Sequence, residues 1–259
     1  MKYGTELFYS NEQTDEVLNF KTKNRKIDKS YKYIHKNLFY NLWSFFTYRL
    51  IATPIAWFYF KLIKKVKFIN KKVLKPHKKD GYFIYSNHTN QFGDAFWPAL
   101  ICFPKKPYVV VNPDNISIPF IGRCLKMWGA LPIPSTIQAT KNFNNALKFH
   151  LNKKRPILIY PEAHLWPYYT KIRNFSSTSF KYPVMFNKPV YTFTTIYKLK
   201  KQGKKPKVEI YVDGPFYPNY TINKKEAQKN LRNIVYLQMN ERCKMSNYEY
   251  LKYFRSNND

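Results

Sequence analysis

The sequence predicts an α/β protein with a mostly parallel central sheet flanked by helices. Short runs rich in β-branched and aromatic residues recur along most of the chain, and stretches with helical patterns separate them. This alternation is typical of parallel sheets, because helices provide the crossover from one strand to the next. An aromatic-rich segment comes before the first of these runs, and 259 residues are enough for one main domain with such an appendage.

Residues 1–75 are predicted to form the appendage. Residues 1–30 are polar and mixed in charge, which indicates an arm that lies over another part of the molecule. They contain no apolar core of a secretory signal, so we expect the protein to stay on the cytoplasmic side. Residues 76–259 are predicted to form the α/β domain.

Residues 37–63 are mostly apolar and aromatic, and Arg49 and Lys61 are their only charged residues. No uncharged run there reaches the roughly 20 residues that a membrane-spanning helix needs. Pro54 is expected to break or kink a helix near Thr53, which leaves two short helical pieces. Because Trp and Tyr rings settle at the membrane interface, the segment is predicted to be an amphipathic helical membrane-binding element. A buried helical hairpin that covers the domain is the alternative.

The α/β domain is predicted from runs with strand or helix patterns that alternate along the chain. The predicted strands are 82–85, 108–111, 130–133, 157–160, 190–197 and 207–212. Helices are expected near 96–103, 119–128 and 138–153, and from Thr221 to roughly Lys244.

The composition narrows the range of partners. The chain has 45 Lys and Arg against 15 Asp and Glu, a formal charge of +30, which favours nucleic acid, an anionic membrane surface or phosphorylated small molecules. Coding bias of an AT-rich genome is the alternative explanation for the excess of Lys. Cys102, Cys124 and Cys243 show no paired spacing, so we expect reduced thiols.

His88 and Asp94 are the first catalytic candidates. His88 follows the predicted strand 82–85, and open α/β sheets bind ligands beyond the carboxyl ends of their strands. A carboxylate that orients one imidazole nitrogen lets the other remove a proton from a hydroxyl. The pair is a catalytic triad without its serine, so the nucleophile is predicted to be the substrate's own hydroxyl. A structural histidine in a strand-to-helix loop is the alternative.

These residues open the first of four blocks in which the chain resembles glycerolipid acyltransferases of the lysophosphatidate acyltransferase type. The family's first block is Asn-His, four residues and Asp, whereas Asn87, His88 and Asp94 match with five residues between His and Asp. Gly93 precedes the aspartate, and we expect a positive φ there to absorb the additional residue as a bulge. Asp94 is then expected to reach His88.

The second and third blocks provide the expected phosphate contacts. In ISIPFIGRCLKMWGALPIP, Phe120 and Arg123 match the family, and the resemblance assigns Arg123 to the acceptor's phosphate; a surface salt bridge is the alternative. In LIYPEAHLWPYYTKIRNF, the Pro-Glu pair matches at Glu162, but Ala-His-Leu replaces the family's Gly-Thr-Arg. We expect Arg173, or Lys171, to provide the positive charge of the missing arginine.

The fourth block resembles NKPVYTFTTIY, in which Pro189 and Val190 match and which in the family lines the acyl or acceptor pocket. The four blocks occur in the family's order over residues 87–190. His164 lies close to Glu162, but no His or Cys at a ligand spacing accompanies it, so no metal is expected.

The resemblance implies the transfer of a fatty acyl group from acyl-CoA or acyl carrier protein to the hydroxyl of a lysophosphatidate-like acceptor, giving phosphatidate. No cofactor beyond the acyl carrier is expected, and the protein is expected at the cytoplasmic face of a membrane, peripheral or monotopic. The implied roles are His88 as general base, Asp94 as its orienting group, Arg123 for the phosphate, Glu162 for holding the site or a substrate hydroxyl, and Asn87, Phe120, Arg173 and Pro189 as further substrate contacts.

The alternative function is that of a basic nucleic-acid-binding protein whose many Tyr and Phe stack on bases. The sequence has no recognised nucleic-acid motif, and most of its aromatic residues lie inside apolar runs. No nucleic acid is therefore expected as a partner.

Overall fold

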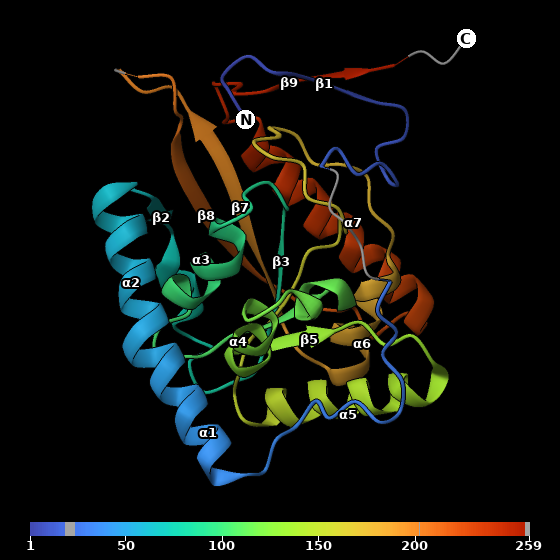
Figure 1. The fold of residues 1–259 in the computed structure, drawn as a ribbon. Helices are drawn as coiled ribbons and strands as arrows, with labels where there is room; N and C mark the ends of the chain where they lie inside the picture. Colours follow the sequence, from blue (N-terminus) through green and yellow to red (C-terminus); the bar gives the residue numbers. More distant parts are fainter. Residues whose placement is uncertain (19–23, 202, 257–259) are drawn as a thin grey trace.

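The computed structural model describes residues 1–18, 24–201 and 203–256 (Figure 1). The strands are β1 (Glu6–Tyr9), β2 (Lys67–Ile69), β3 (Phe83–Ser86), β4 (Tyr108–Val111), β5 (Ala130–Pro132), β6 (Ile157–Ile159), β7 (Val190–Lys198), β8 (Lys207–Phe216) and β9 (Lys252–Arg255). The α-helices are α1 (Leu38–Phe45), α2 (Thr53–Trp57), α3 (Gly93–Ile101), α4 (Ile121–Trp128), α5 (Ile137–Asn152), α6 (Lys181–Phe186) and α7 (Lys224–Cys243). Two π-wound segments are Phe46–Ala52 and Phe58–Ile63, and 3₁₀ turns are Lys71–Leu74, Pro113–Ser117 and Thr178–Phe180.

A seven-stranded sheet forms the centre of the molecule, in the strand order β2-β8-β7-β3-β6-β4-β5. Its neighbouring strands are parallel except β7 and β8, which form an antiparallel pair. Helices pack on both faces of the sheet, as Figure 1 shows. The predicted α/β class with a mostly parallel central sheet is therefore confirmed.

Side chains alternate across the sheet and form two cores. Phe83 and Tyr85 of β3 point to the face that α5 and α7 cover. Between them, Ile84 points to the other face, where Trp97 of α3 and Phe60 of the N-terminal helix pack. This is the two-residue period of a strand buried on both faces, which explains why the sequence there is continuously apolar.

The predicted strands correspond to β3–β8, and the predicted helices to α3, α4, α5 and α7. Strands β1, β2 and β9 were not predicted. The first and last of these pair with each other in parallel as a separate two-stranded sheet, so each depends on a partner at the opposite end of the chain. Strand β2 joins the main sheet beside β8. The division of the chain at residue 75 stays a prediction.

Residues 38–63 form one continuous helix of alternating α and π turns, here called the long N-terminal helix. The expected break at Pro54 is wrong. The amide and hydroxyl of Thr53 both donate to the carbonyl of Tyr48, five residues earlier, the hydroxyl at 2.7 Å. This wider π turn removes the clash that a proline makes with the carbonyl four residues before it in an α-helix.

One stripe of the long N-terminal helix is buried against the domain. Five of its buried residues recur at every fourth position, at Ser44, Tyr48, Ala52, Ala56 and Phe60, and Thr53 is buried beside Ala52. A stripe of every fourth residue stays on one face only if each turn contains four residues. An α-helix has 3.6 residues per turn, so the stripe would move around it, and π turns, which contain more residues, compensate for this shift. The alternative of a buried hairpin is wrong, because a single helix is present and most of its other apolar residues are exposed. Within the described residues, no helix is long and apolar enough to cross a membrane.

Candidate functional site

His88 and Asp94 meet beyond the carboxyl end of β3. His88 Nδ1 lies 2.7 Å from Asp94 Oδ2, and the histidine side chain is 24% exposed whereas the aspartate is buried. With Nδ1–H donating to the carboxylate, Nε2 keeps its lone pair and can accept a proton. Burial raises the pKa of the Asp94 carboxyl, and the hydrogen bond from His88 opposes this rise. In this arrangement His88 can act as a base and Asp94 can orient it.

A turn at Asn90 accommodates the additional residue between His88 and Asp94. The Asn90 side chain accepts the amide of Gly93 at 2.8 Å, and its carbonyl accepts the amide of Asp94 at 2.9 Å. The expected positive φ at Gly93 is wrong, since Gly93 is the first residue of α3 and lies outside the positive-φ glycines. Glycine is required there for space, because a Cβ would lie 2.0 Å from the indole of Trp97.

Tyr160 is a site residue that the sequence reasoning missed. Its ring stacks on the imidazole of His88, with 4.4 Å between centroids and 25° between planes. Its hydroxyl donates to the backbone carbonyl of Asp94 at 2.7 Å. Tyr160 therefore contacts both members of the pair. The available signal was its place directly before Pro161 and Glu162, at the end of a predicted strand.

Glu162 joins the His88 loop to the loop that follows β6. Its carboxylate accepts the amide of His88 at 3.0 Å and the amide of Arg173 at 2.9 Å. The guanidinium of Arg173 lies 3.4 Å from the same carboxylate, and both side chains are buried. Of the two roles expected for Glu162, this geometry favours holding the site.

The N-terminal arm covers Arg173. The guanidinium of Arg173 donates to the carbonyls of Glu12 and His164 and lies over the ring of Trp166. The indole N–H of Trp166 in turn donates to the carbonyl of Asp15 in the arm, at 2.9 Å. The Arg173 side chain is only 1% exposed. The described structure therefore places it under the arm, and its expected contact with an acceptor phosphate stays a prediction.

Asn87 directly follows β3 and Pro189 directly precedes the neighbouring strand β7, so they lie at opposite ends of these parallel strands. Asn87 is fully buried and exchanges two hydrogen bonds with the backbone of Thr195, at 2.8 and 2.9 Å. Pro189 precedes β7, whose first residue pairs with Phe83, the first residue of β3. Since β3 and β7 are parallel, Pro189 lies at the amino-terminal edge and His88 beyond the carboxyl-terminal edge. The structure does not bring these two together.

Phe120 and Arg123 lie at the start of α4. Phe120 is 88% exposed and has a φ of 58°, and Arg123 is exposed one turn further on. Arg123 forms no ion pair with any carboxylate of the described residues, which is against the surface salt bridge. Its guanidinium lowers the pKa of Lys126, after the effects of burial and of Arg25. None of Arg25, Arg123 and Lys126 forms an ion pair with a carboxylate of the described residues.

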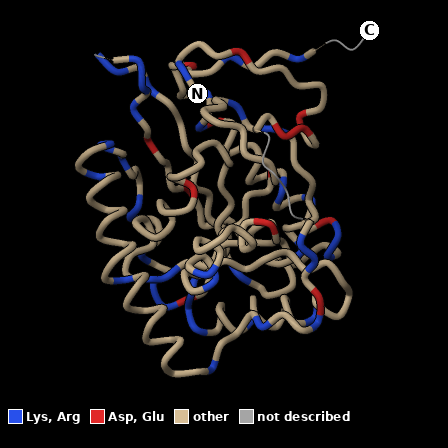
Figure 2. Tube along the Cα trace, in the orientation of Figure 1, with Lys and Arg blue, Asp and Glu red and all other residues tan. Residues whose placement is uncertain are grey.

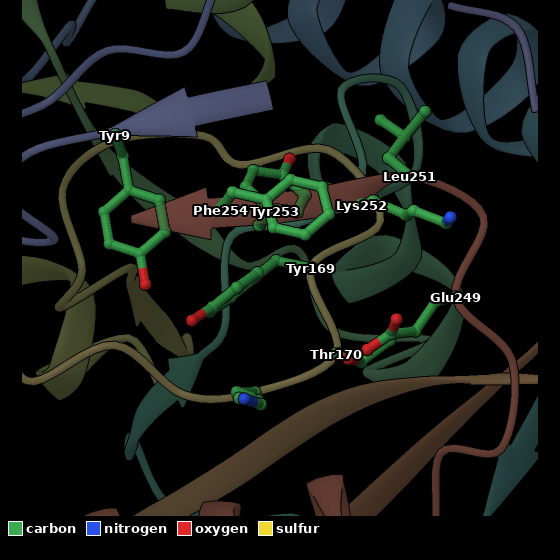
Figure 3. A pocket seen from close by; sticks show the side chains of 9 residues that line it. Tyr9, Tyr169, Thr170, Glu249, Leu251, Lys252, Tyr253 and Phe254 are labelled. Atoms are coloured by element: carbon green, nitrogen blue, oxygen red, sulfur yellow. The ribbon is translucent and has the colours of Figure 1, made fainter. Parts of the chain in front are cut away.

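Two cavities lie near the site loops. One of about 330 Å³ lies between residues 169–171 and the C-terminal segment 249–254, and Lys171, the expected alternative to Arg173, lines it; Figure 3 shows Tyr9, Tyr169 and Tyr253 around it. The other, of about 80 Å³, is apolar and lies between the long N-terminal helix and α3, the helix that contains Asp94. The described residues contain no cluster of His, Cys, Asp or Glu that could hold a metal ion.

No protein-family model matches the sequence, and no curated protein matches it either. Among solved structures, the chain is similar to the crystal structure of the 1-acyl-sn-glycerophosphate (LPA) acyltransferase PlsC from Thermotoga maritima. The match covers 82% of this chain and 98% of that chain, with a TM-score of 0.52 and 14% sequence identity. The chain therefore shares its fold with a lysophosphatidate acyltransferase.

Proposed function

We propose that this protein is an acyltransferase that moves a fatty acyl group from a thioester to the hydroxyl of a lysophosphatidate-like acceptor. The observation that carries the proposal is the His88–Asp94 contact of 2.7 Å beyond the carboxyl end of β3. It coincides with a fold shared with PlsC, a 1-acyl-sn-glycerophosphate (LPA) acyltransferase, whose name gives the same acceptor class. The donor is acyl-CoA or acyl carrier protein, and the product is phosphatidate.

The proposed reaction needs one proton transfer in each direction. His88 Nε2 takes the proton of the acceptor hydroxyl, and the hydroxyl oxygen forms a bond to the thioester carbonyl carbon. The carbon–sulfur bond then breaks, and the imidazolium returns its proton to the leaving thiolate. Asp94 stabilises the imidazolium between these steps. Burial raises the pKa of Cys102 to about 12, so this thiol is a poor competitor for the acyl group.

The direct test is acyl transfer to lysophosphatidate by the purified protein in detergent or lipid. The formation of phosphatidate, followed with a radiolabelled acyl-CoA and then with a labelled acyl carrier protein, supports the proposal and identifies the donor. If neither donor gives product although the protein is folded, the proposal is wrong.

Arg123 is proposed to bind the acceptor phosphate. We expect Arg123→Ala to raise the KM for a phosphorylated acceptor about tenfold or more, because a charge-assisted hydrogen bond contributes roughly 1.5–3 kcal/mol. The KM for the matching monoacylglycerol, which lacks the phosphate, should change little. Equal changes for both acceptors would assign Arg123 to a structural role.

The long N-terminal helix is proposed to attach the protein to the membrane surface, on the cytoplasmic side that the sequence predicts. Most of its apolar residues outside the buried stripe are 43–82% exposed, a surface that prefers the boundary of headgroups and acyl chains. Lysines follow directly, and Lys65, Lys67 and Lys72 are exposed. Each basic residue near an anionic surface contributes about 1 kcal/mol. The apolar cavity behind this helix is a proposed place for part of the acyl chain.

A variant with Trp43, Phe46, Trp57 and Phe58 all changed to Asp should lose the apolar part of membrane binding. These side chains are 44–57% exposed, so we expect the fold to survive. Flotation with anionic liposomes should become strongly sensitive to salt, because salt screens charges beyond about 8 Å at physiological strength. The wild type should be released only partially by a high-salt wash. If the wild-type protein does not bind liposomes but binds RNA tightly, the result supports the nucleic-acid alternative instead.

A further inference from the structure

Two basic residues precede neighbouring strands at the amino-terminal edge of the sheet. Lys106 comes two residues before β4 and Arg155 two residues before β6, and Tyr108 and Ile157 pair across these strands. His88 lies beyond the opposite edge, after β3, which is parallel to β6. The two basic residues therefore lie outside the proposed active site.

Lys106 contacts the underside of the long N-terminal helix. Its Nζ donates to the hydroxyl of Ser44 at 3.0 Å and to the carbonyl of Met127 at 2.6 Å. The ammonium also lies 4.9 Å from the ring centroid of Tyr48 and 5.6 Å from that of Tyr108. An ammonium has three N–H donors, so one remains for a ligand.

The contact of Arg155 with His150 fixes which nitrogen of this histidine carries the proton, and that N–H group is buried without a hydrogen-bond partner. Its Nη1 lies 3.1 Å from the hydroxyl of Tyr108 and 3.2 Å from Nδ1 of His150. A guanidinium can only donate, so Nδ1 accepts and the proton of the imidazole is on Nε2. Both side chains, His150 and Tyr48, are more than nine-tenths buried. Within the described residues, neither Nε2 of His150 nor the hydroxyl of Tyr48 has a hydrogen-bond partner. Buried polar groups without a partner are rare and call for one.

The surrounding charges have one sign. None of the described carboxylates forms an ion pair with Arg49, Lys106 or Arg155, and Figure 2 shows several basic segments beside the lower part of the long N-terminal helix. Burial, and after it the charges of Arg155 and Arg49, lower the pKa of Lys106 to about 7. Burial and the same Arg155 and Lys106 also lower the pKa of His150, to about 3, so this histidine is neutral. An anion would relieve this accumulation of positive charge.

We infer that Lys106, Arg155 and His150 form a binding site for a phosphate-like tetrahedral oxyanion beneath the long N-terminal helix. The planar fork of arginine and the point charge of lysine both suit such a ligand. Lys106, Tyr108 and Arg155 are half-buried, so solvent reaches them. The phosphate belongs either to a free anion or to the headgroup of an anionic phospholipid. The second source rests on the proposed membrane attachment of the helix that contains Ser44 and Tyr48.

Sulfate is the first probe, because its charge does not change near neutral pH. Calorimetric titration of the full chain in detergent should show binding that Arg155→Gln weakens about tenfold or more, as expected for loss of a charge-assisted donor. Lys229→Gln, a change of an exposed residue on α7, should leave the affinity unchanged. Absence of sulfate binding by the wild type, or equal affinities for the wild type and Arg155→Gln, would overturn the inference.

The pH dependence tests Lys106 separately. A lysine with a pKa of about 7 is mostly charged at about pH 6 and mostly neutral at about pH 8, so sulfate affinity should fall as the pH rises. The arginine of the Lys106→Arg variant stays charged at both pH values. The sulfate affinity of this variant should therefore not fall as the pH rises. A wild type with the same affinity at both values would contradict the role of Lys106.

Vesicles distinguish the two sources of the phosphate. Flotation compares phosphatidylcholine vesicles with and without phosphatidylglycerol, for wild type, Arg155→Gln and Lys229→Gln. If the ligand is a headgroup, Arg155→Gln loses more of the binding that depends on phosphatidylglycerol than Lys229→Gln does. If both variants bind vesicles alike while only Arg155→Gln loses sulfate, the site takes a free anion. Neither readout depends on acyl transfer, so a failure of the proposed function leaves this test intact.

Discussion

Replacing His88 by alanine should remove nearly all acyl transfer, with a fall in turnover of roughly 10²–10⁴-fold, the range that a positioned general base contributes. The reason is that His88 is the partly exposed imidazole whose Nδ1 is held by Asp94, which leaves Nε2 for the acceptor hydroxyl. Asp94→Asn should also lose much of the activity with the fold intact, because the amide neither stabilises the imidazolium nor ensures the correct tautomer. Initial rates with lysophosphatidate measure both effects.

The matched control for this experiment is His77→Ala. His77 is also a histidine beside an aspartate, with Nδ1 3.3 Å from Asp80, but it lies in the loop before β3. We expect it to keep wild-type turnover. Circular dichroism and thermal unfolding must show that each variant is folded. A well-folded His88→Ala protein with wild-type activity would reject the proposed mechanism.

Separating Glu162 from Arg173 should cost about 3–5 kcal/mol of unfolding free energy, because removal of one partner leaves an uncompensated buried charge. Glu162→Gln keeps the shape of the side chain and removes its negative charge, and Arg173→Met removes the positive charge and leaves an unbranched apolar side chain. Both should lower the denaturant midpoint at an unchanged slope. Turnover should also fall, since the Glu162 carboxylate holds the amide of His88.

The control pair is Glu241 and Lys244 on the surface of the molecule, which are 63% and 69% exposed. Glu241→Gln should change stability by no more than about 1 kcal/mol, as for other exposed pairs. The double variant of Glu162 and Arg173 should lose less than the sum of the two single variants, because each single change leaves the other charge unpaired. Additive losses would show that the two side chains do not stabilise each other.

The helices and strands that depend on near neighbours in the chain were predictable. Thr136 accepts the amide of Ala139 as the N-cap of α5, which starts within one residue of the predicted position. The apolar runs 82–85 and 157–160 became β3 and β6, because a strand buried on both faces needs continuously apolar residues. The positions of His88 and Asp94 after β3 follow from the same local pattern.

The sequence by itself determined the α/β class, the position of His88 and Asp94 beyond a strand, and an aromatic segment before the domain. The tertiary structure alone decided what surrounds them, since Asn87 and Thr195 are 108 residues apart and Arg173 is covered by residues of the N-terminal arm. It also decided that Pro54 lies inside one helix, because a stripe buried at every fourth residue favours π turns. Such contacts depend on which distant segments fold together, and no local period or spacing encodes that.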